Sequence, residues 1–324
     1  MKIAITGVAG FIGSHLTDVL LARGHQVAGV DNLAMGHLRN IEHHQGCSKF
    51  EFHKIDVRDF AAMRDVFRDA DTIVHLAAFK IPRYGNALET MDVNTSGARH
   101  VLEIARDGNK RVLLASTSDI YGKNPNSPMA ENSDSFLGPT SVTRWSYAVS
   151  KLWDEHTALA YNSSYGVPVT ILRFFGSYGP RQHLSWWGGP QSVFISAILK
   201  NEPVEIHGDG KQTRSFTYIS DLVDGIARAV DYNGTPAIVF NLGNTQEITI
   251  LELANLVKES CDTPQELRIK MIPYATFGGN YEDVRRRVPD IGLARRVLQF
   301  NPTVDIKEGL KYTVQWQRTA MGLG

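Results

Sequence analysis

The chain has 324 residues, of which 43% are hydrophobic and 21% are charged, proportions typical of a folded globular protein. Its 34 Lys and Arg residues balance 34 Asp and Glu residues, so nothing favours binding to nucleic acid or to an anionic membrane surface. The two cysteines, Cys47 and Cys261, lack metal-ligand spacing. This argues against a disulfide framework or a metal site and favours a reducing, cytoplasmic compartment. No apolar run is long enough to predict a signal peptide or a spanning helix.

In the first two-thirds of the chain, short β-branched runs alternate with longer helical patterns, which predicts a parallel sheet with helices on both faces. The predicted strands are 2–6, 26–30, 50–55, 72–76, 111–115 and 167–172. The predicted helices are 11–22, 59–68, 86–105 and 144–165. This order is that of a Rossmann-type, doubly wound dinucleotide fold.

The pattern changes after residue 173, where Gly, Pro, Trp and Arg cluster between 175 and 190. Shorter predicted elements follow at 204–206, 214–219, 238–241 and 250–260. We therefore expect an α/β protein with a cofactor domain at 1–173. A smaller α/β substrate domain would occupy 174–324, with some elements crossing back.

A glycine motif follows the first predicted strand. Gly7, Gly10 and Gly13 would let the backbone turn tightly and bring a helix N-terminus close to a pyrophosphate. Asp31 ends the second strand, 18 residues after Gly13. An acid there can accept hydrogen bonds from ribose hydroxyls and would repel a 2′-phosphate, which favours NAD over NADP. The alternative is a turn-forming aspartate before Asn32.

Tyr147 and Lys151 lie four residues apart on a predicted helix, so both side chains address one point. Ser116, Thr117 and Ser118 end the fifth strand. A tyrosine with a pKa near 10 is a poor base at neutral pH, but a neighbouring ammonium and an oxidised nicotinamide both stabilise the phenolate. Lowering that pKa by roughly three units requires about 4 kcal/mol, a reasonable sum for two close cations.

With these motifs the chain resembles the extended short-chain dehydrogenase/reductase family, and within it the UDP-sugar 4-epimerases and UDP-glucuronate decarboxylases. The matching segments, which span nearly the whole chain, are 7–13, 56–57, 75–78, 116–122, 147–151, 173–181 and 208–216. The resemblance implies a bound NAD, a UDP-sugar substrate and a homodimer formed by the predicted helices 86–105 and 144–165.

The resemblance also assigns cofactor contacts. Asp56 and Val57 would meet the adenine, Lys80 would reach the phosphates or ribose, and Asn94 would hold the catalytic strand. A surface lysine and a helix-surface asparagine are the alternatives for Lys80 and Asn94. The further NAD contacts that the resemblance implies are Phe11, Ile12, Asn32, Leu76, Ala77, Ala78, Ser116, Tyr147 and Lys151.

On the substrate side, Tyr147 would act as base at the sugar C4 hydroxyl, with Lys151 positioning it and Thr117 hydrogen-bonding O4. Arg214 would hold the diphosphate, and Arg181 stands where the loop could meet a sugar carboxylate. For the arginines, a solvated surface is the alternative. The complete set of substrate contacts that the resemblance implies is Thr117, Ser118, Asp119, Tyr147, Gly176, Arg181, Gln191, Arg214 and Arg287.

Three features depart from the family pattern. Gly176 stands where many relatives have Asn. Asp119 stands where decarboxylases and dehydratases carry Glu and where epimerases usually carry a non-acidic residue. The loop containing Trp186 and Trp187 has no counterpart that we can interpret; its rings could stack on a base or sugar, or pack between domains.

The resemblance implies a hydride taken transiently from sugar C4. We expect an NAD-dependent 4-epimerase of UDP-glucuronate, UDP-glucose or both, which works through a 4-keto intermediate. The alternative is a UDP-glucuronate decarboxylase, because a 4-ketone makes the uronate a β-keto acid that loses carbon dioxide readily. Lys80 favours the epimerase and Asp119 the decarboxylase. A non-catalytic dinucleotide sensor is the remote alternative, since it would be expected to lack Tyr147 or Lys151.

Overall fold

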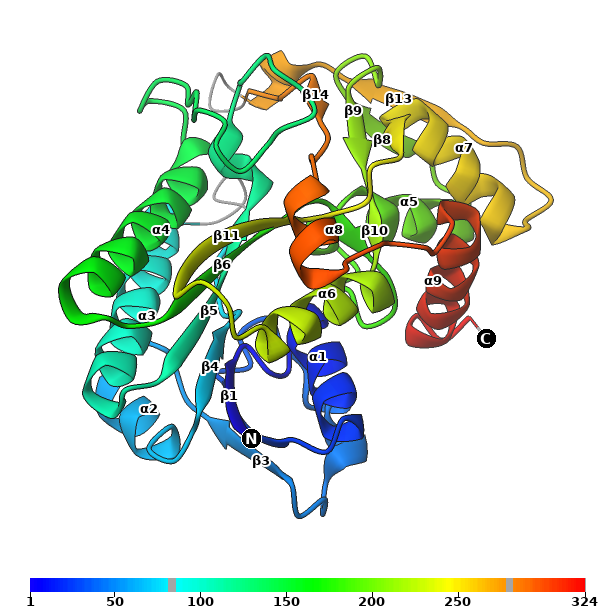
Figure 1. Ribbon diagram of the computed structural model, residues 1–324. Coiled ribbons are helices and arrows are strands. Elements are labelled where there is room, and N and C mark those ends of the chain that lie inside the picture. Colours follow the sequence, from blue (N-terminus) through cyan, green and yellow to red (C-terminus); the bar gives the residue numbers. More distant parts are fainter. Residues whose placement is uncertain (81–85, 278–281, 324) are drawn as a thin grey trace.

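The computed structural model describes residues 1–80, 86–277 and 282–323 and is built around a seven-stranded parallel sheet (Figure 1). The strand order is β11-β6-β5-β4-β1-β2-β3. This confirms the predicted doubly wound fold, whose topology reverses direction between β1 and β4. The strands are β1 (Lys2–Thr6), β2 (Gln26–Asp31), β3 (Phe50–Lys54), β4 (Thr72–His75), β5 (Arg111–Thr117), β6 (Val169–Phe174) and β11 (Ala237–Leu242).

The edge strand β11 comes from the half of the chain that the sequence assigned to the substrate domain. It pairs in parallel with β6, with Val239 opposite Ile171. Phe240 and Leu242 are fully buried in the same cluster as Leu172, so this apolar strand extends the large sheet.

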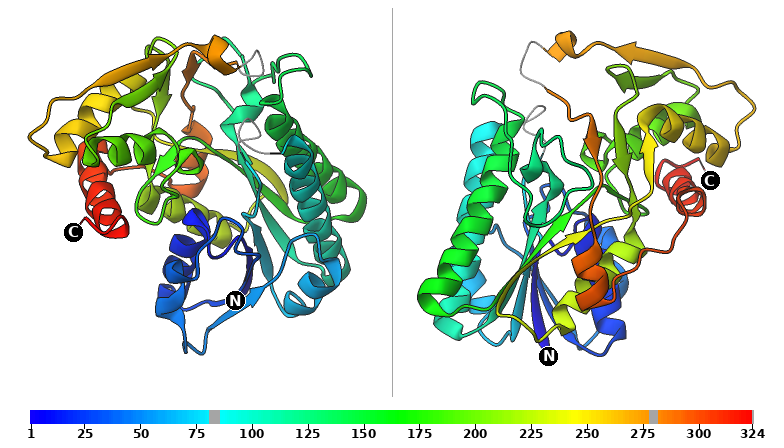
Figure 2. Two further views of the ribbon diagram at one scale, coloured as in Figure 1. Left: turned by 180° about the vertical axis from the view of Figure 1, so that it is seen from behind. Right: turned by 45° about the horizontal axis from the view of Figure 1, so that its top comes forward.

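Helices cover both faces of the sheet, as the alternating pattern predicted (Figure 2). On one face lie α1 (Phe11–Ala22), α6 (Ile219–Asp231) and α8 (Gly292–Leu298). On the other lie α2 (Phe60–Val66), α3 (Ala87–Gly108) and α4 (Trp145–Tyr165). None of the helices in the described parts of the chain is both long and apolar enough to cross a membrane.

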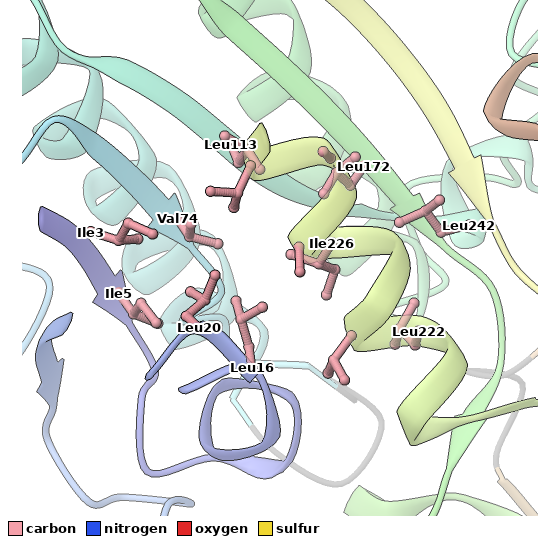
Figure 3. Packing of buried hydrophobic residues seen from close by; sticks show 14 of the residues in the cluster. Ile3, Ile5, Leu16, Leu20, Val74, Leu113, Leu172, Leu222, Ile226 and Leu242 are labelled. Carbon is pink, nitrogen blue, oxygen red and sulfur yellow. The ribbon is translucent and has the colours of Figure 1, made fainter. Parts of the chain in front are cut away.

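Side-chain alternation along the strands divides the core into two layers. Ile3 and Ile5 point towards α1 and α6, whereas Ala4 between them belongs to the opposite layer. Figure 3 shows the first layer, in which strand residues meet apolar residues of the two helices. The residues labelled there are Ile3, Ile5, Leu16, Leu20, Val74, Leu113, Leu172, Leu222, Ile226 and Leu242.

A smaller lobe follows β6, with α5 (Pro190–Leu199), α7 (Ile250–Cys261) and α9 (Ile306–Ala320) around its own core. Its short strands are β7 (Ser177–Tyr178), β8 (Val204–His207), β9 (Thr213–Ser215), β10 (Thr217–Tyr218), β12 (Glu247–Thr249), β13 (Ile269–Ile272) and β14 (Arg286–Arg287). The single short element predicted at 214–219 is divided between two strands and the start of a helix. The chain changes partners there, because β9 pairs with β12 and β14 while β10 pairs with β7, and α6 begins at Ile219.

Candidate active site

A cavity of about 610 Å³ lies between the carboxyl ends of the sheet strands and the smaller lobe, the place where doubly wound folds bind ligands. The residues predicted for the cofactor and substrate sites line it, with two exceptions, Asp56 and Asn94. Those that line it are Gly7, Gly10, Phe11, Ile12, Gly13, Asp31, Asn32, Val57, Leu76, Ala77, Ala78, Lys80, Ser116, Thr117, Ser118, Asp119, Tyr147, Lys151, Gly176, Arg181, Gln191, Arg214 and Arg287.

The glycine turn forms an anion cradle at the N-terminus of α1. Gly7 has φ +74°, and a side chain on Gly13 would place its Cβ 2.1 Å from the Gly7 carbonyl oxygen. Gly10 is the N-cap, and no side chain within the described residues caps the helix. Backbone N–H groups of the first turn therefore face the cavity, as binding of a pyrophosphate requires.

Asp31 lies beside this cradle at the end of β2. Its carboxylate accepts hydrogen bonds from the N–H of Ala9 at 3.0 Å and of Leu33 at 2.8 Å. Burial raises the pKa of Asp31, and these N–H groups oppose that rise. The carboxylate is thus held in a fixed orientation at the cavity wall, which suits a ribose diol.

Asp56, expected to meet the adenine, is not among the residues that line the cavity. Its carboxylate accepts from Arg58 Nη2 at 2.8 Å and from Asn32 Nδ2 at 3.0 Å. The hydrogen bonds of Arg58 hold the pKa of Asp56 well below its usual range. The charge of Asp56 is therefore balanced by Arg58, whereas the neighbouring Val57 lines the cavity.

Asn94 has a structural position in α3, beside the loop that follows β4. It accepts from the Phe79 N–H at 2.7 Å, and its amide donates to the Phe79 carbonyl at 3.2 Å and to Ser150 Oγ at 2.9 Å. It therefore ties the loop before Lys80 to α4, and none of these hydrogen bonds reaches a strand.

The tyrosine and its neighbours converge from α4 and β5. Burial raises the pKa of Tyr147 well above its usual range, with Asp119 and Asp154 adding to the rise and a hydrogen bond with Thr117 opposing it. Lys151 donates to Asp154 across 2.7 Å. The protein's own groups thus favour the protonated form of Tyr147, and a further positive charge in the cavity would favour its ionisation.

The hydroxyl of Ser116 is engaged on the far side of β5. It donates to Glu155 Oε1 at 2.5 Å, while Arg173 donates to both oxygens of Glu155 at 3.0 and 2.7 Å. Arg173 also donates to the Tyr121 hydroxyl at 2.9 Å. This buried network holds β5, β6 and α4 together behind the cavity.

A cluster of five charged side chains faces the substrate side of the cavity. Asp119 pairs with Arg287 at 2.7 Å and with Arg144 at 3.2 Å, and Asp283 pairs with Arg214 at 2.7 Å and with Arg144 at 3.2 Å. Burial opposes ionisation of Asp119, but Arg287 and Arg144 outweigh it and lower its pKa to about 2. Three guanidiniums against two carboxylates leave a net positive charge.

Within this cluster, Arg287 is 9% exposed, and its Nε and Nη2 find no hydrogen-bond partner in the part of the chain that the structure describes. Such unsatisfied donors suit an anionic ligand.

Two members of this cluster, Arg144 and Asp283, were not predicted from the sequence. Arg144 precedes Tyr147 by three residues, and Asp283 precedes an arginine run, which are the only sequence signals for them.

Arg181 lines the cavity, but its guanidinium pairs with Asp18 of α1 at 2.8 Å, so its charge is already balanced. Gln191 is buried and its Nε2 lacks a partner among the described atoms.

Gly176 lies against the backbone of the smaller lobe. A Cβ on Gly176 would lie 2.9 Å from the Ser215 carbonyl oxygen. The asparagine of many relatives therefore does not fit this backbone.

The tryptophan loop bridges the two lobes at the cavity wall, around a short 3-10 turn at Trp186–Gly188. Trp187 meets Phe79 of the sheet domain edge-on, with ring centroids 4.9 Å apart. Trp186 stacks on His207 of β8 at 4.6 Å. Both rings thus pack between the lobes and still border the cavity.

Comparison with known proteins agrees with this fold. Residues 3–243 match the model of the NAD dependent epimerase/dehydratase family. The chain is 37% identical to the UDP-N-acetyl-alpha-D-glucosaminuronate decarboxylase of Bacillus cytotoxicus, covering 97% of each chain. It is 38% identical to UDP-glucuronic acid decarboxylase 1 of Danio rerio, over 97% of this chain and 72% of that one.

Among solved structures, the UDP-glucuronic acid 4-epimerase of Bacillus cereus, in complex with UDP-glucuronic acid and NAD, superposes with a TM-score of 0.88. It is 28% identical, covering 99% of this chain and all of that one. The fold and cavity define a dinucleotide-dependent enzyme of the extended short-chain dehydrogenase type. The chain belongs to the NAD dependent epimerase/dehydratase family, and NAD is its cofactor.

Proposed function

We propose that the protein oxidises a UDP-uronate at C4 and that the resulting 4-keto acid loses carbon dioxide. The observation that carries this proposal is the Asp119–Arg287 ion pair beside Thr117 and Tyr147. An ionised carboxylate with a partly unsatisfied guanidinium at the reacting end suits a sugar whose C6 is a carboxylate. The decarboxylases among the curated relatives support the same choice.

The residue roles in this proposal are those that the family resemblance implies, and all four residues line the cavity. Thr117 hydrogen-bonds the sugar O4, and Tyr147 receives the O4 proton. Lys151 orients the cofactor ribose next to the tyrosine. Arg214 holds the diphosphate of UDP, which contributes binding energy remote from the reacting carbon. Bound NAD would supply the acceptor for the C4 hydride and the donor for its return.

Loss of carbon dioxide from the 4-keto acid requires charged groups that orient the substrate carboxylate and promote its departure. The C5–C6 bond of the 4-keto acid breaks, its electron pair forms the enolate of the ketone, and a proton is added at C5. Arg287 orients the carboxylate before cleavage. Asp119, held ionised by Arg287 and Arg144, repels the carboxylate and so favours its departure as neutral carbon dioxide.

The second candidate is 4-epimerisation of the same substrate, or of UDP-glucose, without loss of C6. Lys80, at the cavity wall, favours it, as does the close superposition on a UDP-glucuronic acid 4-epimerase. Both candidates begin with oxidation at C4 and diverge only at the ketone.

The deciding experiment incubates the purified protein with UDP-glucuronate, UDP-N-acetylglucosaminuronate or UDP-glucose and follows products by proton NMR, without added NAD. We expect a UDP-pentose and carbon dioxide from a uronate. UDP-galacturonate or UDP-galactose would instead establish the 4-epimerase. No turnover of any of the three would contradict both candidates.

We further propose a cytoplasmic homodimer. The unpaired cysteines Cys47 and Cys261 suit a reducing compartment. The outer face of α3 and α4 exposes large apolar side chains, a feature of protein interfaces. They are Leu88, Val149, Trp153, Leu159 and Tyr165.

A further inference from the structure

The face of α4 that carries Tyr147 and Lys151 also carries Asp154. This residue follows Lys151 by three positions and Tyr147 by seven, so helical periodicity places all three on one side of the helix. The Lys151 ammonium donates to Asp154 Oδ2 across 2.7 Å, and the two side chains are 3% and 0% exposed. The proposed reaction, on which this inference rests, gives Asp154 no role.

The neighbours of this ion pair are already engaged or neutral. Glu155 is paired with Arg173. His75 of β4 is buried, and burial together with Lys151 lowers its pKa to about 3, so it stays uncharged. Asp154 is therefore the carboxylate that balances Lys151, and its Oδ1 has no hydrogen-bond partner among the described residues.

We propose that Asp154 is a positioning residue that fixes the Lys151 ammonium and offsets its effect on Tyr147. A lone ammonium would stabilise the Tyr147 phenolate, and a carboxylate bonded to it weakens that stabilisation. A second carboxylate that lines the cavity, Asp119, acts on Tyr147 in the same direction as Asp154. Asp154 thus keeps Tyr147 protonated until another cation enters the cavity.

The substitution Asp154→Asn removes the charge and keeps an oxygen that can accept from Lys151. Tyrosinate absorbance is recorded against pH on the NAD-loaded enzyme, and the same variant with Tyr147→Phe added is subtracted. We expect the Tyr147 titration to move to lower pH by about one unit, and the acid limb of the kcat/KM profile to follow. An unchanged titration would overturn the electrostatic role. The absorbance does not depend on the sugar, so it tests Asp154 even if the proposed substrate is wrong.

The substitution Asp154→Val removes the acceptor as well and tests positioning. We expect the dissociation constant for NAD to rise at least about tenfold, and to stay within about threefold for Asp154→Asn. NAD binding as tight as in the unsubstituted protein would overturn the positioning role. Asp107→Asn, an exposed acid at the end of α3 that pairs with Arg106, is the matched control and should change neither measurement. The valine variant could fail to fold. In that case, a more than tenfold loss of NAD binding by Asp154→Asn would contradict the proposal that the oxygen of Asp154 positions Lys151 and that its charge acts on Tyr147.

Discussion

At the scale of single residues, Tyr147 lies between charges of both signs, and their balance sets how readily its hydroxyl ionises. Asp119 and Asp154 oppose its ionisation, whereas Lys151 lies four residues away on the same helix face. In the proposed reaction, this setting would couple proton removal by Tyr147 to the binding of a cationic ligand.

Replacing Tyr147 by Phe removes the group that accepts the O4 proton but leaves the cavity shape intact. We expect turnover of the UDP-sugar to fall by about 10²–10⁴-fold, with NAD binding within about threefold of the unsubstituted protein. Steady-state kinetics and a fluorescence titration with NAD measure the two quantities. Tyr165→Phe, an exposed tyrosine at the end of the same helix, is the control and should keep full activity. Equal turnover by the two variants would rule out the assigned base.

Asp119 should link folding stability to pH. Arg287 and Arg144 hold its pKa at about 2 in the folded protein, below the value of about 3.9 in an unfolded chain. Its contribution is therefore fully present above pH 4 and is lost as the pH falls towards 2. Urea unfolding at a series of pH values should show a difference between the unsubstituted protein and Asp119→Asn that shrinks by about 2 kcal/mol across this window. A difference independent of pH would show that Asp119 is not held ionised by these arginines.

At the scale of elements, the turn between β1 and α1 decides whether a dinucleotide can bind. Its glycines serve different purposes: Gly7 adopts a positive φ, Gly10 leaves the helix end uncapped, and Gly13 lets the helix approach the turn. The packing of α1 against the sheet and the anion site thus depend on the same few atoms.

Gly13→Ala would put a methyl group 2.1 Å from the Gly7 carbonyl oxygen, so the turn or the helix must move. We expect a loss of about 2–4 kcal/mol of unfolding free energy and at least tenfold weaker NAD binding, measured by thermal unfolding and fluorescence titration. Gly292→Ala, at the start of α8, is the control, because its nearest neighbour is a flexible side-chain oxygen of Asp290 at 3.0 Å. Similar losses in both variants would contradict the steric explanation.

At the scale of the whole molecule, the exposed face of α3 and α4 lies on the opposite side of these helices from the core they cover. On this face Trp153 is 39% exposed. Aromatic side chains in such positions are typical of the buried centre of an interface.

Trp153→Glu would place a charge at the centre of the proposed dimer interface. We expect the unsubstituted protein to sediment as a dimer and this variant to sediment mainly as a monomer at micromolar concentration, because an unpaired buried charge costs several kcal/mol. Met271→Glu, an exposed position on β13 of the smaller lobe, should remain dimeric. A monomeric unsubstituted protein would refute the proposed dimer.

The cofactor half of the fold could be predicted from local signals. β1 and α1 occur at the predicted residues, because a β-branched run, a glycine turn and an apolar helical repeat follow one another within 22 residues. The smaller lobe was harder to predict. The short element predicted at 214–219 splits because its two halves find different partners, and nothing in the local sequence encodes that change.

The sequence by itself determined the fold class, the dinucleotide turn and the Tyr147–Lys151 pair, because each depends on residues close together in the chain. Only the tertiary structure decided the charge balance of the cavity. Asp119 forms an ion pair with Arg287, and Lys151 forms one with Asp154. The spacing of Lys151 and Asp154 along the helix allowed their pairing but did not require it. Electrostatic effects depend on distance and burial in three dimensions, so the pairing of these charges emerges only after folding.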